Sequence, residues 1–412
     1  MPSSKSVIST RPAWRGFHLY LAEDINEADN RSIHALATAL LDKPLPGVTD
    51  IIPSYTTLYL EYDANIVQEN VVRGWCEAVQ TEITSSASGD VTARKTVPVH
   101  YDGEDLAEIS QRVGLTVQQV IDHHTQPDYH VFALGFTPGF AFMGNVPEAI
   151  HTPRRSSPRV RIPAHSVAMT GGQTGVYPSA SPGGWNLLGR ALVAMYDPQR
   201  KPPFWLEPGD RVRFEAREGK PPADVHPLDL LPDNPEMPVL EVVKPGLLDI
   251  VVDGGRTMAG RYGLCRGGML DVVSGTLANR LVGNAPFAPM LELNVVGGRY
   301  RALTPCVIGL AGTGMLAYKN EEVLDPPCSI QLQLDDELSF TPSYVGVRMY
   351  MAVAGGIDSK QFMGSSSVDL NGNIGKPLTA GVVLGQQKQR DVHVASFPNF
   401  QAHQFGETVS LR

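Results

Sequence analysis

The stretch of sequence that decides the fold lies between Gly135 and Phe214. Its densest part reads Pro-Ala-His-Ser-Val at 163–167, Gly-Gly-Gln-Thr-Gly-Val-Tyr-Pro at 171–178 and Ser-Pro-Gly-Gly-Trp-Asn at 181–186. Glycine allows positive φ angles and close backbone approach, whereas proline fixes φ and removes a hydrogen-bond donor. Glycine and proline residues separate short apolar runs such as Val167–Met169 and Leu192–Met195. This pattern predicts strands joined by tight turns. The expected product is a compact β-barrel.

The same stretch carries side chains that could bind a small molecule. They are Gln173, Thr174, Tyr177, Trp185, Asn186 and Arg190. Polar and aromatic groups on glycine-rich loops are typical of a pocket rim. The alternative is that these residues only shape the corners of the barrel.

Several motifs in this region resemble one protein family. They are Phe-Thr-Pro-Gly-Phe at 136–140, Pro153–Arg154, Pro158–Arg159, Gly172–Pro178 and Ser181–Trp185. In this order they are similar to the B subunits of bacterial 5-oxoprolinase, also called allophanate hydrolase subunit 1, a family that includes a sporulation kinase inhibitor. The resemblance implies a cyclophilin-like β-barrel and a structural or binding role for His124 and Tyr129. His165 stands where the family usually carries glycine, and its role is left open.

Residues 1–95 are predicted to form an N-terminal α+β unit. Phe17–Ala22 and Thr57–Tyr62 are expected strands, because apolar residues alternate along them. Asn26–Leu41 has apolar residues at helical spacing, with Asp24 or Asn26 as N-cap, and Val67–Ser85 indicates a second helix. No chemistry is indicated here beyond a structural lid or a partner surface.

Residues 96–220 are predicted to form the first barrel module. A strand is expected at Thr96–His100, a helix from Glu104 or Asp105, and a helix at Thr116–His124 with a capping box from Thr116 to Gln119. His123, His124 and His130 are close in sequence but lack other ligands at metal spacing. Leu206–Phe214 predicts a turn entering an edge-like strand. The Pro- and Asp-rich residues 221–238 are the expected linker.

Residues 239–412 resemble a second family. The motifs are Pro245–Gly246, Asp253–Arg256, Gly267–Asp271, Ala278–Asn284, Leu291–Glu292 and Ala354–Ile357. They are similar to the C subunits of 5-oxoprolinase, or allophanate hydrolase subunit 2, and imply a second β-barrel module with a helix at Thr276–Leu281. The family's Gln-Asp-x-Gly-Arg reads Val-Asp-Gly-Gly-Arg here. Family members continue beyond the equivalent of Arg412, and Val392–Phe405 resembles the opening of that further part. The second module is therefore expected to be shortened, and the sequence is either a fragment or a shortened relative with an altered active site.

The candidate catalytic residues are Asp253, Arg256 and Asp271. Either aspartate could act as a general base or orient one, and an arginine fork suits a carboxylate, a phosphate or a developing oxyanion. Arg154 and Arg159, next to prolines, could do the same. For each, the alternative is a salt bridge or a tight turn at a barrel corner. Ser365–Ser367 could supply a nucleophile, but the sequence identifies no partner base.

Composition excludes several classes of function. Hydrophobic residues make up 42% and charged residues 19%, as in soluble globular proteins, and 40 glycines with 33 prolines favour turn-rich β structure. A net charge of −9 without a Lys/Arg cluster argues against nucleic acid or membrane partners. The polar stretch 1–15 lacks the apolar core of a signal peptide. Four widely spaced cysteines form no metal set, so we expect no metal and a cytoplasmic protein with reduced thiols.

The resemblance implies a component of an ATP-dependent 5-oxoprolinase, which opens a cyclic amide to glutamate together with a separate A subunit, and a site near the contact of the two barrel modules. ATP is implied by resemblance only, because the chain has no Gly-x-x-x-x-Gly-Lys-Ser/Thr loop, and the glycine-rich Gly309–Gly314 favours a strand–turn–strand. One alternative is a carboxyltransferase-like component of a urea carboxylase, with biotin carried by a partner. Another is a non-catalytic binding protein like the kinase inhibitor. The oligomeric state, including a homo-oligomer, is left open.

Overall fold

The computed structural model describes residues 9–13, 15–85, 94–343 and 345–388. The predicted continuation at Val392–Phe405 lies outside these residues. The chain divides into two compact units: the first holds residues up to Pro227 together with Thr257–Arg266 and Asn371–Asn373, and the second holds the remainder. Among the described residues, no helix combines the length and apolarity needed to cross a bilayer.

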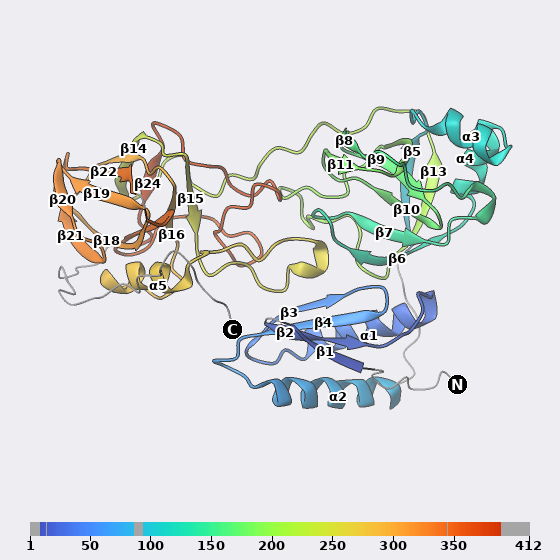
Figure 1. Cartoon of the computed structure of the whole chain (residues 1–412), viewed down its shortest axis with the longest axis horizontal. Coiled ribbons are helices and arrows are strands. Elements are labelled where there is room, and N and C mark those ends of the chain that lie inside the picture. The colour runs from blue at the N-terminus through green and yellow to red at the C-terminus, as the bar shows by residue number, and fades with distance from the viewer. Residues whose placement is uncertain (1–8, 14, 86–93, 344, 389–412) are drawn as a thin grey trace. The chain divides into compact units, whose positions relative to one another are not determined.

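The first part of unit 1 is a four-stranded antiparallel sheet with two helices (Figure 1). Helices α1 and α2 pack against each other, and apolar residues of both join the sheet in one core. Asn26 caps α1 by accepting a hydrogen bond from the backbone N–H of Asp29. The elements, in the sheet order β1-β2-β4-β3, are β1 (Ser9–Ala13), β2 (Gly16–Tyr20), β4 (Thr57–Tyr62) and β3 (Val48–Pro53), with α1 (Glu27–Asp42) and α2 (Glu69–Ser85). The predicted α+β unit is therefore present, with the predicted N-cap.

The second part of unit 1 is a closed seven-stranded barrel. Its strands, in order around the barrel, are β10 (Gln173–Val176), β7 (Ala141–Gly144), β6 (Tyr129–Leu134), β13 (Arg211–Ala216), β5 (Arg94–His100), β12 (Asn186–Ala191) and β9 (Ser166–Thr170). A separate two-stranded sheet pairs β8 (Arg159–Ile162) with β11 (Ser181–Gly183), and η1 (Glu148–Ile150) is a short 3-10 turn. The barrel confirms the fold class that the glycine- and proline-rich stretch predicts.

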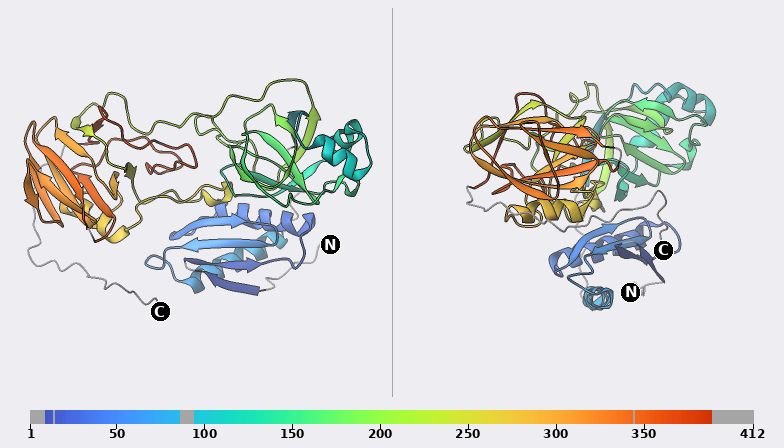
Figure 2. Two further views of the ribbon diagram at one scale, coloured as in Figure 1. Left: turned by 45° about the horizontal axis from the view of Figure 1, so that its top comes forward. Right: turned by 60° about the vertical axis from the view of Figure 1, so that its left-hand side comes forward.

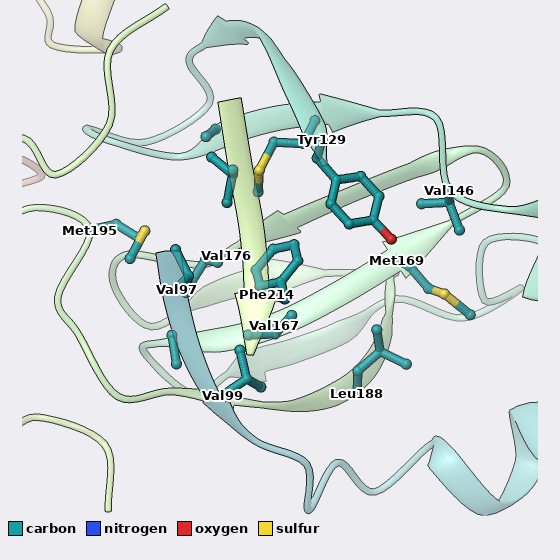
Figure 3. Close-up of a cluster of buried hydrophobic side chains, with 14 of the residues drawn as sticks. Val97, Val99, Tyr129, Val146, Val167, Met169, Val176, Leu188, Met195 and Phe214 are labelled. Carbon is teal, nitrogen blue, oxygen red and sulfur yellow. The ribbon is translucent and has the colours of Figure 1, made fainter. Parts of the chain in front are cut away.

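Apolar side chains fill the barrel interior (Figure 3). Tyr129, Val167, Met169 and Phe214 belong to this core. Helices α3 (Leu106–Val113) and α4 (Val117–Thr125) contribute further apolar residues to it, and α4 begins with the predicted capping box at Thr116. The interior is therefore a packed core, and any ligand site of this module lies elsewhere.

Two details of the first module differ from the sequence-based prediction. The strand β13 is not an edge strand, because it lies between β5 and β6 and pairs in parallel with β5. Leu192–Met195 is not a strand; it bends, and Met195 enters the barrel core. The run is apolar because it packs on the core, which periodicity alone cannot separate from strand formation.

The described part of unit 2 consists of two sheets around a shared core, with one helix (Figure 2). The six-stranded sheet is β20 (Glu322–Leu324), β19 (Met315–Lys319), β22 (Glu337–Pro342), β17 (Arg299–Ala302), β14 (Pro238–Lys244) and β24 (Val383–Gly385). The five-stranded sheet is β15 (Leu248–Val252), β16 (Met290–Asn294), β23 (Arg348–Val353), β18 (Cys306–Thr313) and β21 (Cys328–Leu332). Helix α5 (Val272–Leu281) packs on β18 and β23. The 3-10 turn η2 (Gly260–Tyr262) belongs to unit 1.

Candidate functional site

The turn after β15 brings the predicted Asp253 to a cluster of three serines in unit 2. Its Oδ1 accepts hydrogen bonds from the hydroxyls of Ser365 and Ser367, both at 2.6 Å, and from the backbone N–H of Gly255 at 2.8 Å. Its Oδ2 accepts from the backbone N–H of Ser366 at 2.6 Å. All three serines are fully buried. Asp253 is therefore the partner carboxylate that the sequence could not assign to these serines, and the predicted tight turn is also present.

Arg256 lies beside this cluster with its guanidinium fully buried. One terminal nitrogen donates to the backbone carbonyl of Ser367 at 2.6 Å, and the other lies 3.6 Å from a carboxylate oxygen of Asp369. A Cβ added at Gly267, where φ is 63°, would lie 3.2 Å from this guanidinium. The glycine therefore allows its loop to pack directly on Arg256. In this geometry the arginine contacts both the loop around Gly267 and the segment Ser367–Asp369, and its charge does not face solvent.

Asp271 is the exposed member of the predicted catalytic set. As N-cap of α5, its Oδ1 accepts from the backbone N–H groups of Val273 and Ser274 at 3.1 and 3.0 Å. Its own backbone N–H donates to the hydroxyl of Tyr350 at 2.8 Å, and that hydroxyl donates to Glu292 at 2.7 Å. Burial is the main cause that raises the pKa of Tyr350. Its Oδ2 accepts from the hydroxyl of Ser274. Asp271 is thus an exposed residue at the N-terminus of α5, where the helix dipole stabilises negative charge.

Glu292 holds the hydrogen-bonded group around Asp271 and Tyr350 in place. The sequence pointed to it only as part of the Leu291–Glu292 motif. It is buried on β16 and accepts from the Arg348 side chain at 3.2 Å and from the backbone N–H of Leu270 at 3.1 Å. The backbone N–H of Met269 donates to the carbonyl of Asp253 at 3.0 Å. The loop 267–271 is therefore held at two points, by Asp253 and by Glu292. The sequence signal that could have found Glu292 is a single charged residue in a mostly apolar strand, Met-Leu-Glu-Leu-Asn at 290–294.

In unit 1, the predicted His124 and Thr174 meet in one buried chain of hydrogen bonds. Thr174 Oγ1 donates to the carbonyl of Ala168 at 3.0 Å, so it accepts from His124 Nε2 at 2.9 Å. His124 Nδ1 then accepts from the hydroxyl of Tyr101 at 2.7 Å. Complete burial lowers the pKa of His124 to about 3. The ring is therefore neutral and fixed in one tautomer.

Three other predicted binding residues of unit 1, namely Tyr177, Trp185 and Arg154, lie near one another. Tyr177 and Trp185 are buried in a second small core with Phe140. Arg154 is exposed, and its Nε would lie 2.9 Å from a Cβ added at Gly184.

Gln173 and Arg190 take part in two further contacts. Gln173 donates its side-chain amide to the Tyr55 hydroxyl at 2.8 Å. Arg190 is half-buried, and its charge helps to lower the pKa of His165, for which burial is the larger cause.

Arg159 belongs to a structural corner of the first module. It donates to Oδ1 of Asp105 at 2.7 Å, and Arg155 donates to the same oxygen at 2.9 Å. Oδ2 of Asp105 accepts from the backbone N–H of Leu187 at 2.7 Å. Asp105 is buried, so these partners offset the cost of its burial. The salt-bridge alternative describes Arg159 in this structure.

Models of known protein families match both the N-terminal and the C-terminal part of the chain. A model for carboxyltransferase domain subdomains C and D matches residues 13–206, and a model for subdomains A and B matches residues 262–409. The chain belongs to this carboxyltransferase-domain family, in the fused form in which a segment like the B subunit of 5-oxoprolinase precedes one like the C subunit.

Individual relatives match one half or nearly all of the chain. The B subunit of 5-oxoprolinase from Bacillus subtilis is 40% identical over 204 residues, which cover 47% of this chain and 85% of that protein. The C subunit of 5-oxoprolinase from Escherichia coli K12 is 33% identical over 137 residues, which cover 33% of this chain and 44% of that protein. The crystal structure of TTHA0988 is similar with a TM-score of 0.89 and 47% identity, and the match covers 94% of this chain and 78% of that one.

Proposed function

We propose that this chain is a component of an ATP-dependent 5-oxoprolinase-type hydrolase, in which it takes the places of both the B and the C subunits. The observation that carries the proposal is that segments similar to these two subunits follow each other in one chain. A separate protein like the A subunit would complete the complex and would bind and hydrolyse ATP. The substrate would be the cyclic amide 5-oxoproline, opened to glutamate.

Within unit 2 we propose a division of labour among the predicted catalytic residues. Asp271 faces solvent, so it is the residue that would touch substrate and act as a base or orient one. Asp253 and Arg256 are buried and engaged with the serine segment, so they would act by fixing the loop that carries Asp271. The backbone contact from Met269 to Asp253 connects the two groups.

The test measures 5-oxoproline-dependent ATP hydrolysis and glutamate release by the full chain mixed with a protein of the A-subunit type. Asp271→Asn is the informative variant, because asparagine caps a helix as well as aspartate does but carries no charge. We expect this variant to fold normally and to lose activity by about 100-fold, the scale of one acid–base group. Asp335→Asn, an exposed carboxylate of the same unit, is the matched control.

Two outcomes would contradict the proposal. Absence of 5-oxoproline-dependent turnover with a folded chain and a competent A-type partner would reject the function. Full activity of Asp271→Asn would reject the role of Asp271 alone.

A second candidate is carboxyl transfer in a urea carboxylase system. It is favoured by a match of 35% identity over 136 residues to the urea amidolyase of Lachancea kluyveri, although these cover only 7% of that protein. In this case biotin would be carried by a partner chain. Urea-dependent loss of the carboxyl group from carboxybiotin, with no response to 5-oxoproline, would distinguish it from the first proposal.

A further inference from the structure

A cavity of about 210 Å³ in unit 1 lies where motifs distant in sequence converge. Its wall includes Pro138 of the Thr-Pro-Gly motif, Ala164 of Pro-Ala-His-Ser and Pro178 of the Tyr-Pro pair. Further parts of the wall come from Asp224 and from Asn373. The residues proposed for the reaction in unit 2 do not line it. Residues of several sequence motifs in the first module therefore line this cavity, and the proposed function assigns no role to these motifs.

Rigid neighbours fix the shape of this cavity. Tyr196, which lines the cavity, stacks on Phe204 with ring centroids 5.0 Å apart. Phe204 in turn stacks on Tyr262 with ring centroids 4.3 Å apart. The Tyr196 hydroxyl donates to the carbonyl of Gly372 at 2.6 Å, which holds the segment 371–373 in place. A Cβ added at Gly139 would lie 2.9 Å from Tyr196, so only glycine lets the Thr-Pro-Gly turn pack so closely. A wall of stacked rings and tight turns is pre-organised for a ligand.

The strained backbone of His165 adjoins a residue that lines this cavity. His165 has φ of 65°, in the left-handed region, and its ring is fully buried. The neighbouring Ala164 lines the cavity. A buried histidine in a conformation that favours glycine is energetically costly, and such strain is concentrated at binding sites.

The lining chemistry defines the ligand. The polar residues of the lining are Asp224, Asn371, Asn373, Ser179 and Tyr196, and no lysine or arginine of the described residues lines the cavity. A carboxylate and amide carbonyls accept hydrogen bonds from N–H groups, and the carboxylate repels an anion. The volume is below the roughly 300–1,000 Å³ of pockets for drug-sized ligands, which excludes a nucleotide.

We propose that this cavity binds a small nitrogen compound, an ammonium ion or a neutral amide, whose N–H groups donate to Asp224. The site disfavours small carboxylates, and its lining includes none of the residues proposed for the reaction in unit 2. The proposal does not rest on the proposed function, and its test requires no partner protein.

The test compares three five-membered rings that differ in charge: protonated pyrrolidine, neutral 2-pyrrolidinone and the anion of 5-oxoproline. Dissociation constants of the full chain are measured by ligand-observed saturation-transfer NMR. Ala180→Leu, at an exposed position on the rim, fills the cavity without altering the core. Only binding that Ala180→Leu removes is assigned to the cavity.

We expect both pyrrolidine and 2-pyrrolidinone to bind the cavity more tightly than the 5-oxoproline anion. Asp224→Asn should raise the dissociation constant of pyrrolidine by about threefold to fivefold, the effect of losing a solvent-exposed charge pair. The dissociation constant of 2-pyrrolidinone should change less. Asp24→Asn, the same change at an exposed aspartate of unit 1, should change neither.

The proposal is overturned if neither the cation nor the neutral amide binds. It is equally overturned if their binding survives Ala180→Leu, or if the anion is the preferred ligand of the cavity.

Discussion

At the scale of single residues, His124 shows how burial turns a titratable group into a structural one. Replacing it by leucine removes the acceptor of the part-buried Tyr101 hydroxyl and the donor to the buried Thr174 hydroxyl, which keeps its own bond to the Ala168 carbonyl. We expect His124→Leu to lower the free energy of unfolding by about 2 kcal/mol, the cost of unsatisfied buried groups. Urea denaturation measures it, with His123→Leu on the same helix as the control. Equal losses in the two variants would contradict this role.

His165 allows the backbone contribution to be separated from the side chain. Alanine and glycine both remove the imidazole, but alanine retains the Cβ that is strained at φ of 65°. We therefore expect His165→Ala to be less stable than His165→Gly by about 1 kcal/mol. Thermal denaturation of the two variants under one condition gives the difference. If alanine were the more stable, the left-handed conformation would not be the controlling factor.

Residue-level partners were the part of the site that the sequence could not supply. The tight turn at Asp253 is local, so its glycines predict it. The serines that bind Asp253 lie 112 to 114 positions away, and only the fold of unit 2 brings them together. Glu292 and Tyr350 meet for the same reason, on neighbouring strands β16 and β23. Local pattern cannot specify such long-range contacts.

At the scale of elements, helix α1 docks on strand β6 through buried polar groups. The side chain of Asn30 donates to the carbonyls of Ser54 and Tyr55 and accepts from His130, and His34 contacts the carbonyl of Phe132 at 3.1 Å. The rings of the two histidines lie 5.9 Å apart.

This contact predicts sensitivity to acid. Burial, then the charges of His130 and Arg261, lowers the pKa of His34 to about 4 from its ordinary value near 6.5. The unfolded chain binds the proton first, so stability is complete above about pH 6.5 and falls as the pH drops toward 4. The full loss is on the order of 3 kcal/mol.

Measuring the free energy of unfolding between pH 4 and pH 7 tests this dependence. His34→Gln, which retains a donor for the Phe132 carbonyl but cannot titrate, should flatten the curve. His18→Gln, at a half-exposed position on β2, should leave it unchanged. A curve for His34→Gln as steep as that of the natural chain would show that other groups cause the acid loss.

Elements with local signals were predicted well. The N-cap of α1, the capping box of α4 and the glycine turn between β18 and β19 all depend on neighbours within a few positions. The predictions that were wrong concern tertiary placement: β13 lies inside the barrel sheet, and Leu192–Met195 packs on the core without being a strand. Strands β1 and β3 were not predicted, because their apolar and polar residues do not alternate cleanly.

At the scale of the whole molecule, the chain divides into two compact units, each with hydrophobic cores of its own, and this division predicts two cooperative unfolding transitions. Leu188 in the barrel and Leu310 in the five-stranded sheet are both fully buried. Each Leu→Ala change leaves a cavity and should cost about 2–5 kcal/mol. We expect Leu188→Ala to lower one calorimetric transition and Leu310→Ala to lower the other. A double variant should show the sum of the two effects, because distant sites act independently. If either single variant lowered both transitions equally, the chain would unfold as one cooperative body, and a change in the barrel would then reach the proposed reaction site in unit 2 through stability alone.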